Sequence, residues 1–120
     1  MTLVDTSVWV DHLIRTNAEL VQLLGNLDVL THPDVIGELA CGNLKDRQTT
    51  LREFLALPEA IVASDKEVML CIEKRNLWRT GIGWTDAHLL TSALLTHCRL
   101  WSLDGRLQKA AAALGVAASL

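Results

Sequence analysis

The stretch LVDTSVWVDHL, residues 3–13, is informative about the fold because its hydrophobic pattern changes from strand-like to helix-like within a few positions. Residues 2–5 have the pattern of a short buried strand that ends in the acidic residue Asp5. Residues 7–14 have the apolar spacing of a helix that begins directly afterwards. We therefore expect a strand followed closely by a helix, with an acid at the junction.

The same alternation of strand-like and helix-like segments continues along the chain. Asn17 is a suitable helix N-cap, Pro33 suits the first turn of a helix, and Ser64 with Glu67 forms the sequence of a capping box. Alternating strands and helices predict an α/β fold of three layers, with a central parallel sheet and helices on both faces. The length of 120 residues fits one domain over residues 1–120. Strands are expected at 28–31, 60–63, 100–103 and 116–118, and helices at 17–24, 33–42, 45–57, 64–79, from 85 or 86 onward, and after 104.

Four acidic residues lie where strands pass into helices or in the helix just after. They are Asp5 in LVDTS, Glu38 in VIGELACG, Asp86 in GWTDAHLL and Asp104 in LWSLDGRL. The carboxyl ends of parallel strands lie along one edge of a sheet, so these acids can converge there. Carboxylates brought together repel one another unless a cation neutralises them. The pattern therefore predicts a site for a hard divalent ion, Mg²⁺ or Mn²⁺.

Each acid also has a simpler explanation. Asp5, Asp86 and Asp104 precede or open a predicted helix, where aspartate commonly caps free N–H groups. Glu38 lies within a helix and could face solvent. Taken singly, these interpretations are the more frequent ones, and only the joint placement of the four acids favours a shared site.

Composition limits the class of protein. Half of the residues are hydrophobic and the mean hydropathy is +0.26, which leaves apolar surface for a subunit interface. The formal net charge is −3, and the four site acids account for more than all of it, so nucleic acid is not excluded as a partner. Cys41, Cys71 and Cys98 are far apart and form no CxxC pair, which favours buried cysteines in a reducing cytoplasm. The first residues lack the basic start of a signal peptide, and no apolar run reaches the ~20 residues of a membrane span.

The four acidic segments, in this order and over essentially the whole chain, resemble the PIN-domain ribonucleases. The opening VDTSVWVDHL, residues 4–13, resembles in particular the VapC toxins of bacterial and archaeal toxin–antitoxin pairs. In that family a strand ends in an aspartate followed by Thr or Ser, matched by Asp5-Thr6-Ser7. A helical glutamate is matched by Glu38 in GELACG, an aspartate opening an apolar helix by Asp86 in DAHLL, and a final aspartate by Ser102-Leu103-Asp104.

The resemblance implies a PIN fold, Mg²⁺ or Mn²⁺ as cofactor, and endonucleolytic cleavage of RNA. We expect Asp5, Asp86 and Asp104 to be metal ligands and Glu38 to be a ligand or a general base. The hydroxyls of Thr6 and Ser102 are placed to orient these acids. The resemblance also implies a small VapB-like antitoxin as partner, whose Arg or Lys would reach the acids, and a homodimer as the base of the complex.

Three other classes of protein are alternatives to this interpretation. A receiver-like signalling module needs paired acids after its first strand, and a haloacid-dehalogenase-like phosphatase needs a DxD motif; residues 5–7 provide neither. A PIN scaffold that only binds its target would not require all four acids.

Some residues remain open to two interpretations. Trp84 could stack on an unpaired base or fill the core, and His88 is expected at the surface or in packing. Basic residues at 45, 47 and 52 and at 74, 75 and 79 could guide an RNA backbone or form solvated helix faces.

Overall fold

A small parallel sheet lies at the centre of the molecule. In the computed structural model, which describes residues 1–120, strand β1 (Thr2–Val4) lies between β2 (Val29–Leu30) and β3 (Arg99–Trp101). Leu3 of β1 pairs with Leu30 on one side and with Leu100 on the other, and both pairings are parallel. Every residue of β1 is buried, as expected for the central strand of a sheet covered on both faces.

The two outer strands predicted at 60–63 and 116–118 do not form. Each is reduced to a single parallel bridge, Thr31 with Glu59 and Leu100 with Ala117. In the first segment, the N–H groups of Ile61 and Ala63 donate to the side chains of Thr96 and Ser92, so they are not available for a strand ladder. The second segment is rich in alanine, which has a low preference for strands.

Seven α-helices and one short 3₁₀ helix, η1, surround the sheet. The predicted caps are confirmed, since Asn17 accepts from Leu20 N, Pro33 opens a helix, and Ser64 and Glu67 form a capping box. The helix predicted over 64–79 is interrupted, because Asn76 adopts a left-handed backbone conformation (φ 54°) that ends it. The helices are α1 (Thr6–Arg15), α2 (Ala18–Gly25), α3 (Pro33–Ala40), α4 (Arg47–Leu55), α5 (Asp65–Lys74), η1 (Leu77–Arg79), α6 (Trp84–Thr96) and α7 (Gly105–Ala113).

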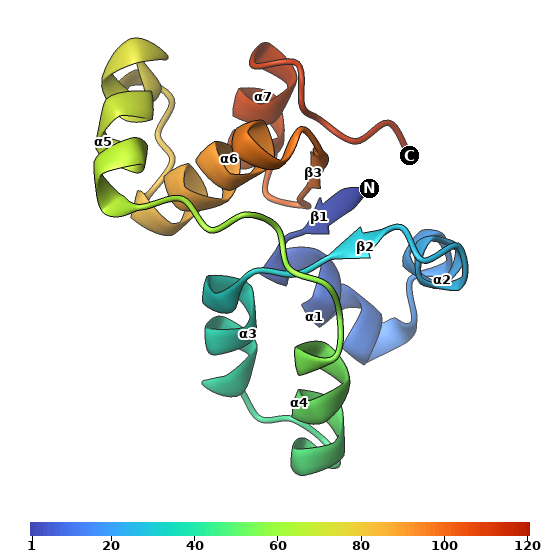
Figure 1. Ribbon diagram of the computed structural model, residues 1–120. Coiled ribbons are helices and arrows are strands. Elements are labelled where there is room, and N and C mark those ends of the chain that lie inside the picture. The colour runs from blue at the N-terminus through green and yellow to red at the C-terminus, as the bar shows by residue number, and fades with distance from the viewer.

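The helices form two groups on opposite sides of the sheet (Figure 1). Helices α1, α3 and α4 pack against one another on one side, and α5, η1, α6 and α7 occupy the other. Helix α6 packs against both α5 and β3, and its residues 87–93 are all buried. This arrangement is the predicted three-layer α/β/α fold.

The remaining expectations about burial are met in part. Cys98 is buried, but Cys71 is only partly buried and Cys41 is exposed, because it follows the end of α3 at the surface. Trp9 and Trp101 belong to the hydrophobic core. None of the helices combines the length and the apolar character needed to cross a membrane.

Candidate active site

The parallel pairing of β1 and β3 brings two of the four acidic segments together. The N–H of Asp5 donates to the carbonyl of Trp101 across the strands at 2.9 Å. Both strands end at the same edge of the sheet, so Asp5 lies beside the segment Ser102-Leu103-Asp104 although 97 positions separate it from Ser102. Helices α1 and α7 begin directly after these two strand ends.

Asp5 is the most firmly held of the four acids. Its exposed fraction is only 7%, and one carboxylate oxygen accepts from the N–H of Thr6 at 2.8 Å, which caps α1. The other oxygen accepts from the hydroxyls of Ser7 at 2.9 Å and Ser102 at 2.6 Å. Hydrogen bonds to an ionised acceptor are strong, so these three donors fix the position of the carboxylate.

Ser7 and Ser102 also shape the turn that carries Asp104. Ser7 Oγ accepts from the N–H of Leu103 and Ser102 Oγ accepts from the N–H of Asp104, both at 2.9 Å. Ser102 thus orients Asp5, as the sequence predicted, and Ser7 does so as well. Ser7 was not predicted from the sequence, although its place two residues after Asp5 in the DTS segment was a usable signal.

Glu38 reaches the site from α3, which packs against α1. Its carboxylate accepts from the hydroxyl of Thr6 at 3.0 Å, so Thr6 contacts Glu38 through its side chain and Asp5 through its backbone. Although part of Glu38 is exposed, atoms packed around its carboxyl reduce its hydration and raise its pKa. The hydrogen bond from Thr6 lowers this pKa, and the charges of Asp5 and Asp86 raise it. Glu38 also lies near the carboxyl end of α3, where the helix dipole disfavours a negative charge.

Asp86 lies in the first turn of α6, on the opposite side of the sheet from α3. Its carboxylate faces the N–H of Gly83 at 3.4 Å, a long hydrogen bond that closes the first turn. Partial burial raises the pKa of Asp86, this hydrogen bond lowers it, and the charges of Asp5 and Asp104 raise it. Asp86 therefore has less hydrogen-bond support than Asp5.

Asp104 is the N-cap of α7 and accepts from the N–H groups of Arg106 at 2.9 Å and Leu107 at 3.4 Å. The simple capping interpretation is thus correct for Asp104, and it is also correct for Asp5. Capping does not separate either residue from the other acids. The charge of Asp5 raises the pKa values of Glu38 and Asp86, and the charge of Asp104 raises the pKa of Asp86, so electrostatic interactions link all four acids.

The sequence and this arrangement match one known family. The model of the PIN domain matches residues 2–113. The chain belongs to the PIN-domain family. It is 46% identical over 118 residues to Ribonuclease VapC32 of Mycobacterium tuberculosis, in strain CDC 1551 / Oshkosh and in strain ATCC 25618 / H37Rv alike. The matched region covers 98% of this chain and 95% of that protein, which confirms the resemblance inferred from the four acidic segments.

The acids of this PIN domain have the chemistry of a site for a hard cation. Carboxylate oxygens are preferred ligands of Mg²⁺ and Mn²⁺, and the raised pKa values of Glu38 and Asp86 indicate negative charge that water does not fully compensate. No three His, Cys, Asp or Glu side chains are placed closely enough to enclose an ion as they stand. The fit therefore rests on the donor set and its charge, with Asp5 fixed and the other carboxyl groups less constrained.

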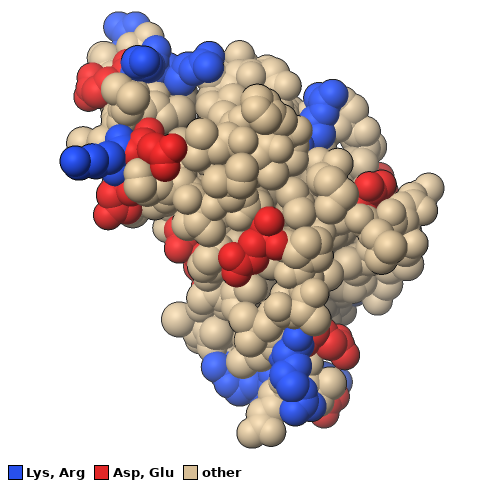
Figure 2. Space-filling model, viewed as in Figure 1, with Lys and Arg blue, Asp and Glu red and all other residues tan.

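The ambiguous residues are now placed. His88 is buried and its Nε2 lies 3.1 Å from a carboxylate oxygen of Asp65, which accepts the hydrogen bond, so His88 packs between α6 and α5. Trp84 is half-exposed beside the site, which contradicts a role as a core residue. Arg47 bonds to the carbonyls of Ala40 and Gly42 and so stabilises the end of α3. On the face shown in Figure 2, Lys and Arg side chains gather at the two ends of the molecule, over α5 and over α4, with acids among them.

Proposed function

We propose that this chain is a divalent-metal-dependent endoribonuclease and the toxin of a toxin–antitoxin pair. The observation that carries the proposal is that the charges of Asp5, Glu38, Asp86 and Asp104 interact within a PIN domain, with Asp5 and Asp104 held together at one edge of the sheet. The identity of 46% with a protein named as a ribonuclease of the VapC type supports the same activity here.

Asp5, Asp86 and Asp104 would hold the cation, Mg²⁺ or Mn²⁺. When bound, such an ion supplies charge for a scissile phosphate and acidifies a water molecule so that it can attack. Ser7 and Ser102 keep the carboxylate of Asp5 in one orientation, which prepares this ligand before metal and RNA arrive. The caps of α1 and α7 place the positive ends of two helix dipoles beside the acids, which lowers the cost of gathering them.

Glu38 would act as a fourth ligand or as the general base. A base works best when its pKa approaches the working pH, and reduced hydration moves the pKa of Glu38 in that direction. The hydroxyl of Thr6 holds one of its oxygens and leaves the other free to face a water molecule. These features favour proton transfer by Glu38 without excluding coordination.

The activity is tested by incubating the purified chain with a structured RNA in Mg²⁺ or Mn²⁺ and in EDTA. Cleavage should require the metal, and Asp86→Asn should abolish it while the protein still folds, as judged by circular dichroism. Asp28, which is partly exposed and directly precedes β2, provides a matched control, since Asp28→Asn removes one charge outside the site. Cleavage that persists undiminished in EDTA, or in Asp86→Asn, would contradict the proposal.

A groove next to the acids supports a protein partner. Val10, Leu13 and Ile14 of α1 line a cavity of about 290 Å³ that also includes Thr6 and Glu38. Leu13 lines a neighbouring cavity of about 210 Å³ with Trp9 and Phe54, so the groove continues toward α4. An amphipathic helix of a VapB-like antitoxin fits such an apolar surface, and an Arg or Lys beyond it would reach the carboxylates. This partner would block the site by neutralising its charge.

Co-expression with a candidate antitoxin from the adjacent reading frame, followed by pull-down, tests the partner. Ile14→Asp should weaken capture strongly, because Ile14 is 78% exposed in the free chain and would be buried in the complex. Leu27→Asp is the control, since Leu27 is 83% exposed in the turn between α2 and β2 and outside the groove. Equal capture of both variants would exclude this groove as the docking surface.

We also retain the proposals of a homodimer and of a cytoplasmic location. Exposed Met69 and Leu70 on α5 lie away from the groove and would support a contact between two copies. Light scattering on the purified complex should give a mass corresponding to two copies of each chain. A mass for one copy of each would contradict the dimer and leave the nuclease proposal intact.

A further inference from the structure

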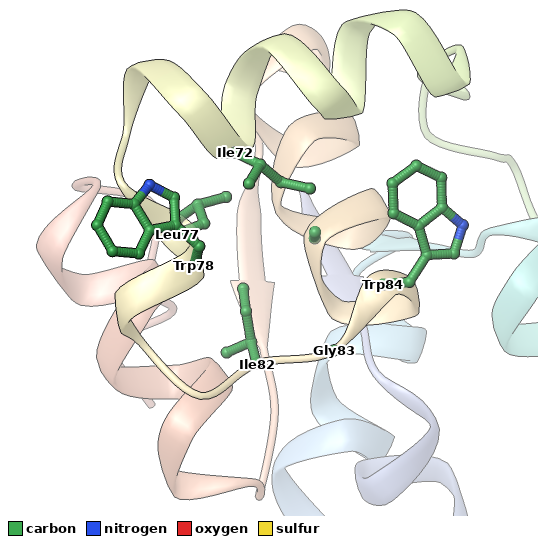
Figure 3. A pocket seen from close by; sticks show the side chains of 7 residues that line it. Ile72, Leu77, Trp78, Ile82, Gly83 and Trp84 are labelled. Carbon is green, nitrogen blue, oxygen red and sulfur yellow. The ribbon is translucent and has the colours of Figure 1, made fainter.

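A second, apolar pocket lies beside Asp86 on the α6 side of the molecule. It has a volume of about 230 Å³ and is formed by η1, the loop before α6 and the start of α6. Trp78 and Trp84 lie at opposite ends of it, with Ile72 and Ile82 between them (Figure 3). Trp78 is 61% exposed and Trp84 is 47% exposed, so two large aromatic faces are available to a ligand.

Trp84 is held in a defined orientation at the start of α6, the helix that carries Asp86. It precedes Asp86 by two positions, and its ring meets the ring of His88 edge to face, with centroids 4.7 Å apart. His88 is in turn bonded to Asp65 at 3.1 Å. Trp84 and Asp86 lie in the same first turn of α6, but two positions along a helix turn their side chains about 200° apart, so Trp84 lines the pocket while Asp86 points away from it.

Trp78 connects this pocket to a basic one. The guanidinium of Arg79 lies 5.0 Å from the centre of the Trp78 ring, a cation–π contact. Arg79 also lines a neighbouring cavity of about 340 Å³, together with Arg106 and Lys109 of α7. No acidic residue lines either cavity, so three cations stand together without a facing carboxylate.

The basic pocket lies at the start of α7, the helix that Asp104 caps. Arg106 follows the N-cap Asp104 by two positions and donates its N–H to it. Gly81 has a φ of +78°, and a side chain there would meet the Cδ of Arg106 at 3.4 Å, so the loop passes close to this arginine. Helix α6 thus contributes Asp86 and part of the aromatic pocket, and α7, which Asp104 caps, contributes part of the basic pocket.

We propose that these two pockets form a subsite for one unpaired nucleotide of RNA, with its base against Trp84 and Trp78 and its phosphate near Arg79, Arg106 and Lys109. Bases stack on exposed aromatic rings whatever their sequence, and arginine pairs well with phosphate oxygens. A protein surface or a second copy would have to bury three unpaired cations, which is costly, whereas a polyanion satisfies them. The inference rests on the proposed nuclease function and specifies its substrate as a single-stranded or looped segment.

Binding of an oligouridylate in EDTA, which withholds the cation that the proposed hydrolysis requires, tests the subsite on the full chain. Stacking should quench tryptophan emission, because Trp9 and Trp101 are buried and Trp78 and Trp84 are exposed. Trp84→Ala should weaken binding about tenfold, and Trp84→Phe should retain most of it. Arg106→Ala should weaken binding and reduce the slope of log K against log salt by about 1. Arg52→Ala is the matched control, since it removes the same charge from α4, far from the subsite.

The opposite results would overturn the inference. Binding by Trp84→Ala, Trp78→Ala and Arg106→Ala that equals binding by Arg52→Ala would show that the pockets take no part. Equal affinity for a duplex of the same length would show that no base is stacked. Loss of a dimer in Trp84→Ala, measured by light scattering, would assign the surface to a second copy. Cleavage is assayed separately: normal cleavage with unaltered binding refutes the subsite alone, and subsite-dependent binding without cleavage refutes the nuclease alone.

Discussion

The site has two parts that differ in how their carboxylates are held. At the end of β1, Asp5 is buried and accepts three hydrogen bonds, from Thr6, Ser7 and Ser102. On the helices that flank this strand end, Glu38 accepts one side-chain hydrogen bond and Asp86 one long backbone hydrogen bond. Reduced hydration raises the pKa values of Glu38 and Asp86.

This difference indicates that the two parts of the site have different roles. Asp5 belongs to the structure of the fold, since its partners also shape the turn that leads to Asp104. Glu38 and Asp86 carry negative charge that the protein itself compensates poorly, so a bound cation would stabilise the ionised forms of these two residues most. We infer that Asp5 at the strand end fixes the position of the proposed metal site. Glu38 and Asp86 on the helices would adjust to the cation that it binds.

Substitutions of Asp5 and Asp86 should have large effects on cleavage and should differ in their effect on the free energy of unfolding. Asp5→Asn and Asp86→Asn should both reduce cleavage by at least about 10³-fold, because each removes a charge from the metal site. Their free energies of unfolding should change in opposite directions. Asp5→Asn should lose about 1 kcal/mol, since one of the two carboxylate oxygens becomes an NH₂ group, which cannot accept from Thr6 on one side or from Ser7 and Ser102 on the other. Asp86→Asn should be neutral or stabilising at pH 7 without metal, because it relieves repulsion.

Urea unfolding in EDTA measures both changes, and cleavage is followed separately in Mn²⁺. If both variants lose the same stability, the contrast between a fixed and an adaptable part is wrong. If both retain activity, the assignment of the acids is wrong.

The next effect concerns the hydroxyl that joins the strand end to Asp104. Ser102→Ala should lower activity or metal affinity about 10- to 100-fold and destabilise the protein by about 1–3 kcal/mol, because Asp5 loses a donor and the N–H of Asp104 loses its acceptor. Ser92→Ala is a close control. Ser92 is equally buried and bonds to His32 and Ala63, but it lies away from the acids. It should lose similar stability and keep its activity, whereas equal activity in the two variants would deny Ser102 a role in the site.

The two parts also differed in how well the sequence predicted them. The strand–acid–helix order around Asp5 is local, so hydrophobic period and capping chemistry were enough to place it, and the same held for Asp104. The convergence of the acids followed from the general geometry of parallel sheets. The hydrogen bond between Thr6 and Glu38 joins residues 32 positions apart and depends on how α1 packs on α3, which no local pattern encodes.

The failures have the same cause. Residues 60–63 have strand-like composition, but the side chains of Ser92 and Thr96, distant in sequence, take the N–H groups that a strand would need. The helix breaks at Asn76 because this residue adopts a left-handed conformation. Asparagine tolerates that conformation, but its presence in a sequence does not predict it. Trp84 could not be assigned to core or surface until the packing of α5 on α6 was known.

A smaller effect distinguishes the parts by pH. The folded chain holds protons on Glu38 and Asp86 more tightly than the unfolded chain, so it binds more protons between the ordinary carboxyl pKa of about 4 and the raised values. Its free energy of unfolding should therefore fall, through these groups, as pH rises across that window. The double variant Glu38→Gln/Asp86→Asn should lack this loss, and its melting temperature should gain on that of the wild type with rising pH. Saturating Mn²⁺ should stabilise the wild type and close the gap at pH 7, and a constant gap at all pH values would refute the prediction.

The smallest effect should come from Thr6, whose side chain touches only the adaptable part. Thr6→Val keeps the shape of the residue and its backbone bond to Asp5 but removes the donor to Glu38. Because that bond lowers the pKa of Glu38, its loss should raise this pKa further. If Glu38 is the general base, the acidic limb of the pH profile of kcat should move to higher pH, with a loss of only about tenfold at pH 7. Thr6→Ser restores the donor and should restore the profile. A profile that Thr6→Val leaves unchanged, with weaker Mn²⁺ binding in its place, would identify Glu38 as a ligand and extend the metal site across both parts.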